Sequence, residues 1–117
     1  MTTYDLMIKV KNELEAKGFT TNTFDDYKRY ANATKDNKSE RRPVAGYDFT
    51  HLYGFTVEFV VVHRHNGTSE NQSVDISIFE WKASLGKRVT KERINTKMGE
   101  KAIKTRINKI ADIYETL

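Results

Sequence analysis

The stretch FTVEFVVVH, residues 55–63, decides the fold. Its odd positions carry Phe55, Val57, Phe59 and Val61, so an extended chain would present one wholly apolar face. This period of two predicts a β-strand with that face buried. The even positions begin polar and become apolar, which predicts that the second half of the strand lies centrally in its sheet.

A second strand is predicted at VDISIFEW, residues 74–81, where the pattern alternates again. Val74, Ile76 and Ile78 face one way, and Asp75, Ser77, Phe79 and Trp81 face the other. Before it, His65-Asn66-Gly67 and the polar run to Ser73 are typical of a hairpin connection, because Asn-Gly favours the positive φ of tight turns. The two strands are therefore expected to pair antiparallel.

The segment after this hairpin leaves two alternatives open. Ser84-Leu85-Gly86 favours a turn. Residues 87–96 then form either a third antiparallel strand, with Val89 as its main apolar anchor, or an ordered basic loop.

Amphipathic helices are predicted at both ends of the chain. Over residues 3–17, Leu6, Val10 and Leu14 recur every four residues, Thr2 and Asp5 match a capping box, and Gly18 ends the pattern. From about Met98 to Leu117 the apolar residues step by four and three. They are Ile103, Ile107, Ile110, Tyr114 and Leu117. Both apolar stripes are expected to pack against the sheet.

The segment between the first helix and the first strand carries weaker signals. Residues 19–23 alternate like a short strand, while an aromatic repeat every three residues favours a helical turn, and we favour an extended segment over 19–30. Residues 31–45, ANATKDNKSERRPVA, are polar and contain the only proline. They predict a polar, mobile loop.

These elements predict an α+β fold in a single domain, residues 1–117. A small antiparallel sheet of about three strands, built on a central hairpin, would be packed by an N-terminal and a C-terminal helix. The absence of cysteine excludes a disulfide scaffold and a thiolate metal site. The charged N-terminus and the lack of any long apolar run predict a cytoplasmic protein with no membrane partner.

The positive charge of the chain is concentrated in one segment. Residues 87–109 hold nine Lys or Arg against two Glu, a net charge of +7, so the rest of the chain carries −3 of the total of +4. A merely solvated surface tends to mix signs, whereas several cations together favour contact with phosphates. The predicted nucleic-acid-binding residues are Lys87, Arg88, Lys91, Arg93, Lys97, Lys101 and Lys104, with Phe79 and Trp81 as stacking candidates.

The alternative is that the lysines cover the solvent-exposed side of a helix and that Phe79 and Trp81 belong to an apolar core. A second helix layer, or a partner copy in a homodimer, could cover these two aromatic residues. The sequence leaves both interpretations open.

The sequence signals for catalysis or metal binding are weaker than those for nucleic-acid binding. His63 and His65 share a strand face, with His51 as a third candidate ligand, yet no metal motif surrounds them and no metal site or cofactor is predicted. Glu80-Trp81-Lys82 is similar to the Glu-x-Lys spacing of PD-(D/E)xK nucleases, with Asp48 or Asp75 as a second carboxylate. The same spacing recurs at residues 15–17 in a predicted helix, so we expect no catalytic residues and no enzyme.

The order helix, three strands, helix resembles the double-stranded-RNA-binding domain, with Phe55-Thr56-Val57-Glu58 and the helix of Lys101 and Lys104 as the matching parts. That resemblance implies a last helix whose lysines face phosphates. The family places its basic pair at the start of that helix, whereas Lys87-Arg88 precedes the helix here by about ten residues.

The leading hypothesis is a small non-enzymatic nucleic-acid-binding protein, DNA or RNA, with a regulatory or accessory role. Its size and its composition, rich in Lys, Asn and Ile, are like those of phage or plasmid accessory proteins. The alternative is a protein-binding inhibitor or adaptor, such as an anti-CRISPR-type protein. A metal-dependent nuclease ranks third.

Overall fold

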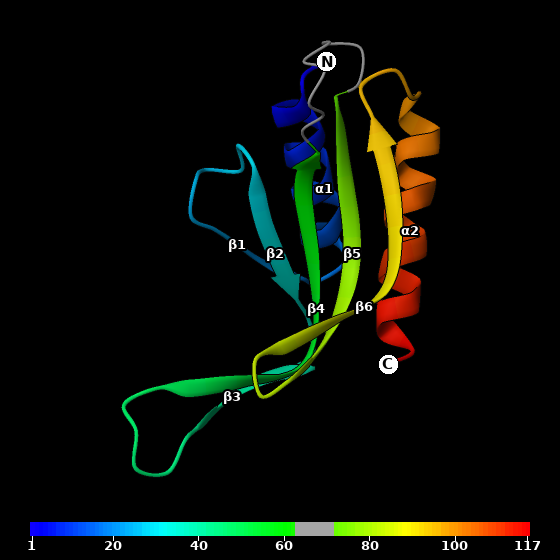
Figure 1. Ribbon diagram of the computed structural model, residues 1–117. Helices are drawn as coiled ribbons and strands as arrows, with labels where there is room; N and C mark the ends of the chain where they lie inside the picture. Colours follow the sequence, from blue (N-terminus) through cyan, green and yellow to red (C-terminus); the bar gives the residue numbers. More distant parts are fainter. Residues whose placement is uncertain (63–71) are drawn as a thin grey trace.

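The structure is a computed structural model that describes residues 1–62 and 72–117 (Figure 1). Within these ranges the chain is α+β, with two helices and an antiparallel sheet of six strands. In chain order the elements are α1 (Thr3–Ala16), β1 (Thr20–Thr23), β2 (Tyr30–Thr34), β3 (Ser39–Pro43), β4 (Thr50–Val62), β5 (Ser73–Lys82), β6 (Leu85–Asn95) and α2 (Glu100–Glu115).

Strand β4 organises the sheet because it pairs along its whole length. On one edge, its first half pairs with β3 and its second half with β2. On the other edge, β5 pairs with β4 from Gly54 to Val62, and β6 pairs with β5. The spatial order is β1-β2-β4-β5-β6, with β3 beside the start of β4. The hairpin Ser39–Gly54 therefore projects from the body of the sheet as an arm (Figure 1).

The N-terminal helix forms as predicted. The Thr2 hydroxyl accepts the Asp5 amide at 3.2 Å, and the Asp5 carboxylate accepts the Thr2 amide at 2.8 Å, which completes the capping box. Gly18 follows the helix with φ +92, in the left-handed region where glycine is favoured. The predicted stripe is buried on the sheet side of α1.

The C-terminal helix also forms, and its predicted stripe is buried up to Tyr114. Leu117 lies beyond the helix and is 39% exposed, so its predicted place in the stripe is wrong. The Tyr114 hydroxyl accepts the Lys35 amide at 3.2 Å and donates to the Phe55 carbonyl at 3.1 Å. These bonds tie the end of α2 to the β2–β3 connection and to β4.

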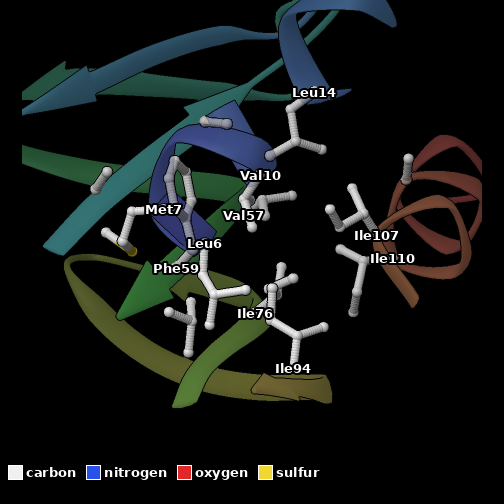
Figure 2. Close-up of a cluster of buried hydrophobic side chains, with 14 of the residues drawn as sticks. Leu6, Met7, Val10, Leu14, Val57, Phe59, Ile76, Ile94, Ile107 and Ile110 are labelled. Atoms are coloured by element: carbon white, nitrogen blue, oxygen red, sulfur yellow. The ribbon is translucent and has the colours of Figure 1, made fainter. Parts of the chain in front are cut away.

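Both helices pack against the same face of the sheet, which we call the covered face (Figure 1). Figure 2 shows Leu6 and Val10 of α1 and Ile107 of α2 meeting Phe59 and Ile76 of the sheet. Val57, Phe59 and Val61 of β4 are buried in this core and Phe55 packs against it partly buried, as the alternation at residues 55–63 predicts. Neither α1 nor α2 has the length and apolar composition needed to cross a membrane.

The sheet is larger than the sequence indicated. About three strands were predicted, and the additional ones are β1, β2 and β3. The predicted loop at residues 31–45 is wrong, because it contains most of β2 and all of β3. In β2 the buried residues are Ala31 and Ala33, which are too weakly apolar to give a clear alternation. The extended segment at 19–30 is right over β1 and at Tyr30, where β2 begins.

The region after β5 resolves the alternatives that the sequence left open. Ala83 and Ser84 both have positive φ and join Lys82 to Leu85, so the turn lies one residue earlier than predicted. Residues 85–95 then form a strand and not a loop. Val89 is 43% exposed and is not the apolar anchor, which is Ile94.

Two further predictions concern the connection between the two central strands and the overall order of the strands. The connection predicted at His65-Asn66-Gly67 lies outside the described residues. The three-strand order shared with the double-stranded-RNA-binding domain does not hold, because β1, β2 and β3 precede the central hairpin.

Candidate functional site

The face of the sheet opposite the helices is the candidate site. No element within residues 1–62 and 72–117 covers it, and we call it the open face. Successive strand residues alternate between faces, and directly paired residues share one. The register therefore places on the open face Asn22, Tyr30, Asn32, Arg41, Leu52, Thr56, Glu58, Ser77, Phe79, Trp81, Arg88, Lys91 and Arg93.

An aromatic pair lies on the open face near the end of β5. The rings of Phe79 and Trp81 have centroids 5.9 Å apart, and the Arg88 guanidinium lies 5.5 Å from the centre of the Phe79 ring. The Trp81 indole N–H donates to the Thr56 hydroxyl at 2.8 Å, which fixes the orientation of the ring. Both rings are partly exposed, so neither of them belongs to the apolar core.

Gly86 allows the Trp81 ring to lie close to β6. A Cβ atom at this position would come within 2.7 Å of the indole. Any larger residue would push the ring away from the strand or displace the strand itself.

A β-bulge in β6 determines which cations reach the open face. Between residues 78 and 79 of β5 the register shifts, so Val89 is the extra residue. Before the shift, the odd residues Lys91 and Arg93 share a face with Ser77 and Asp75; after it, the even residue Arg88 pairs with Phe79. The bulge thus brings Arg88 to the same face as Lys91 and Arg93, and it turns Lys87 to the other face.

Two of the open-face cations are held by a carboxylate. Arg93 contacts both oxygens of Asp75, at 2.7 and 3.1 Å, and the Lys91 ammonium lies 3.9 Å from the same group. This pairing raises the pKa of Arg93 above its ordinary value. Arg41 and Arg88 have no carboxylate partner within 4.0 Å among the described residues. Among the described residues, the open face therefore offers two guanidinium groups without a carboxylate partner, Arg41 and Arg88, beside one guanidinium and one ammonium group that Asp75 already engages.

The remaining predicted cations lie elsewhere. Lys101 and Lys104 are on α2, Lys97 is in the connection that precedes it, and Lys104 pairs with Glu13 of α1 at 3.6 Å. Lys109 pairs with Glu92 at 2.7 Å. The positive excess of residues 87–109 is thus divided between the open face and the helix side, and part of it is neutralised.

A hollow of about 260 Å³ lies beside the aromatic pair. It is lined by Phe24, Tyr30, Asn32, Arg41, Leu52, Thr56, Glu58, Trp81 and Ser84. A second depression adjoins it along β1 and β3 and shares Phe24, Asn32 and Arg41. Phe24 is 95% exposed, which is unusual for a large apolar side chain.

Glu58 is the acidic residue that lines this hollow. Its carboxylate accepts the Tyr30 hydroxyl at 2.9 Å. Burial raises the pKa of the Glu58 carboxyl, and the hydroxyl of Tyr30 and the charge of Arg88 only partly oppose that effect. Burial likewise raises the pKa of the Tyr30 phenol, so Tyr30 stays a donor at neutral pH.

Apart from Trp81, the sequence analysis missed the residues of the hollow. Phe24, Tyr30, Asn32 and Arg41 come from segments whose strands were not predicted. Glu58 gave one signal that could have been used, because it is a charged residue within an otherwise apolar strand.

Among the described residues, the side chains needed for a nuclease centre or a metal site are not assembled. Asp75 and Glu80 lie on opposite faces of β5, so their carboxylates cannot share one cation. Within residues 1–62 and 72–117, no cluster of three His, Asp or Glu side chains has metal-binding geometry. His63 and His65 are outside these ranges.

Comparison with known proteins finds no significant match. The chain matches no family model, and no curated protein or solved structure is significantly similar to it.

Proposed function

We propose that this chain is a non-catalytic protein of the regulatory or accessory type that binds single-stranded nucleic acid on the open face of its sheet. The observation that carries the proposal is the meeting of Phe79, Trp81 and Arg88 on a face that no described element covers. Lys91 and Arg93 lie on the same face, and Arg41 lies beside the hollow.

Unpaired bases suit this surface better than a duplex does. Bases that are not stacked in a helix can stack on aromatic side chains, and each such contact contributes about 1–3 kcal/mol without requiring a particular sequence. A cation over an aromatic ring, as Arg88 lies over Phe79, can contact a phosphate while the ring contacts the base. Duplex bases are hidden from such rings.

The electrostatics of the open face favour a polyanion modestly. Arg41, Arg88, Lys91 and Arg93 outnumber the two acidic residues, Glu58 and Asp75. Four phosphate contacts on a single strand predict a slope of about −3 for the logarithm of the binding constant against the logarithm of the salt concentration.

Anisotropy of labelled oligothymidine and oligouridine, measured at two salt concentrations, tests the proposal. Trp81 is the only tryptophan, so quenching of its fluorescence reports directly on the open face. Phe79→Ala should weaken binding by about 5- to 150-fold. A duplex of the same length should bind more weakly than either single strand.

Two double variants distinguish the faces of the molecule. Arg88→Ala with Lys91→Ala removes cations from the open face, and Lys97→Ala with Lys101→Ala removes them from the helix side. The first pair should reduce affinity and the salt slope more than the second. Equal losses, or a larger loss from the second pair, would contradict an open-face interface.

A second candidate function, protein docking, is favoured by the arm. Tyr47 and Phe49 at its tip are 67% and 49% exposed, with ring centroids 5.3 Å apart. Exposed aromatic residues on a projecting element are typical anchors of protein interfaces. An inhibitor that inserts this arm into an enzyme would use these side chains.

Inhibition of a nucleic-acid-guided nuclease tests this alternative. The wild-type chain should slow cleavage, and Tyr47→Ser with Phe49→Ser should abolish that inhibition while leaving nucleic-acid affinity unchanged. Inhibition that survives the double substitution, or no inhibition by the wild type, would remove the arm as a docking element.

A further inference from the structure

We propose that the hollow beside Trp81 binds one guanine base. The proposal rests on single-stranded nucleic-acid binding by the open face and names the base that this face selects. It follows from the size of the hollow, from its aromatic residues and from the kinds of hydrogen-bonding groups that line it.

The size of the hollow suits one planar group. At about 260 Å³ it falls below the range of about 300–1,000 Å³ typical of sites for drug-sized ligands. Trp81 lines it with an indole held by Thr56, and Phe24 lines it with a ring that is 95% exposed. A base that enters the hollow can contact both rings and cover Phe24.

The Glu58 carboxylate can only accept hydrogen bonds, so it selects a group that donates them. Among the described residues, its one hydrogen bond comes from Tyr30, which leaves acceptor capacity on a carboxylate that lines the hollow. The partial burial of Glu58 makes unsatisfied capacity costly. A ligand with two neighbouring donors would satisfy both carboxylate oxygens.

Guanine is the base that presents such a pair. Its ring N1–H and its exocyclic N2 amino group lie side by side on one edge. Adenine and cytosine place an acceptor nitrogen beside their amino group, and that nitrogen would face a carboxylate oxygen. Uracil and thymine offer one N–H between two carbonyls. The donor pattern of guanine therefore matches Glu58, and the others do not.

Arg41 complements the other edge of the same base. Arg41 lines the hollow, and its guanidinium can donate two parallel hydrogen bonds. Guanine O6 and N7 are adjacent acceptors that arginine commonly contacts in this way. A carboxylate and a guanidinium in one hollow thus offer groups for both edges of guanine.

The test uses oligothymidine that carries one central guanine, inosine or adenine. Inosine lacks only the N2 amino group, so it isolates the second donor. With the wild-type chain, the guanine oligomer should bind about tenfold more tightly than the adenine one, with inosine in between. Guanosine 5′-monophosphate and adenosine 5′-monophosphate, added alone and followed by Trp81 fluorescence, show whether a free nucleotide also enters.

Glu58→Gln is the decisive variant, because its amide can still accept the Tyr30 hydroxyl but offers one acceptor and one donor to the base. The ratio of guanine to adenine affinity should fall to about one. Glu80→Gln, on the opposite face of β5, should keep the wild-type ratio. Circular dichroism checks that both variants fold.

The outcomes separate this proposal from the proposed function. If all oligomers bind equally and neither nucleotide prefers the hollow, the guanine site is overturned while open-face binding stands. A guanine preference that Glu58→Gln leaves intact also overturns it. If guanosine monophosphate binds selectively and no oligomer binds, the hollow is a guanine site, but the proposed function fails.

Discussion

The two faces of one sheet differ in how they use neighbouring residues of the same strands. On β4, Val57 and Phe59 are buried beneath the helices, while the alternating residues Thr56 and Glu58 turn to the open face. The covered face is apolar and closely packed, whereas the open face gathers aromatic rings, cations and a partly buried carboxylate. Substitutions one position apart should therefore act on different properties, stability on one face and binding on the other.

The largest effect is expected from the covered face. Phe59 is fully buried and its ring stacks on Tyr27 with centroids 6.3 Å apart. Phe59→Ala should lower the free energy of unfolding by about 3–5 kcal/mol, because the cavity removes contacts as well as burial. Chemical denaturation followed by circular dichroism measures this loss.

The matched variant lies one residue away. Val60 is on the open face and only partly buried, so Val60→Ala should cost about 1 kcal/mol. Equal losses at the two positions would mean that the open face is covered in solution, and the comparison would then fail.

Tyr114→Phe tests the hydrogen bonds that the Tyr114 hydroxyl makes with the backbone of Lys35 and Phe55. Removing the hydroxyl leaves the Lys35 amide and the Phe55 carbonyl without this partner. The expected loss is about 1–3 kcal/mol, the cost of an unsatisfied buried polar group. Thermal unfolding measures it, and an unchanged midpoint would show that water replaces the hydroxyl.

Gly86→Ala disturbs the open face with a smaller effect on stability. The added methyl group would lie 2.7 Å from the Trp81 ring, so the ring must move. We expect a shifted tryptophan emission and weaker oligothymidine binding. The stability loss should be about 1 kcal/mol, the low end for overpacking, because the ring is partly exposed. Gly99→Ala is the control, since nothing lies within 4 Å of its added Cβ.

Much of the covered face could be predicted because its signals are local. The stripes of α1 and α2, the capping box at Thr2 and the alternation of β4 and β5 all follow from spacing along the chain. Strands β1 to β3 were not predicted because they are short and polar and because they form through strand pairing, β1 with β2 and both β2 and β3 with β4. Their stability comes from these partner strands, which periodicity within one segment does not reveal.

The open face could be predicted only in part. The alternation of β5 placed Phe79 and Trp81 together, and the charge imbalance drew attention to Arg88, Lys91 and Arg93. The bulge at Val89, which selects Arg88 over Lys87, depends on register with β5 and leaves no mark in the sequence. The hollow draws on β2, β3 and β4 together, so it required the unpredicted strands.

The smallest expected effect is a pH dependence from Glu58. Burial raises the pKa of Glu58 in the folded state, so ionisation opposes folding. That penalty is fully present above the folded pKa and absent below the unfolded one. Glu58→Gln should therefore raise the free energy of unfolding at pH 7, by less than about 1 kcal/mol because the group is partly exposed. The gain should disappear below about pH 4.

Denaturant titrations of the wild type and Glu58→Gln at pH 4 and pH 7 measure this difference. Glu80→Gln, whose carboxylate lies 3.8 Å from the Lys82 ammonium on the other face, should give no gain at pH 7. A gain at Glu58 that persists unchanged at pH 4 would trace to packing and not to charge. The hollow would then be a structural feature of the sheet, and the case for a carboxylate kept there to bind a ligand would lose its electrostatic basis.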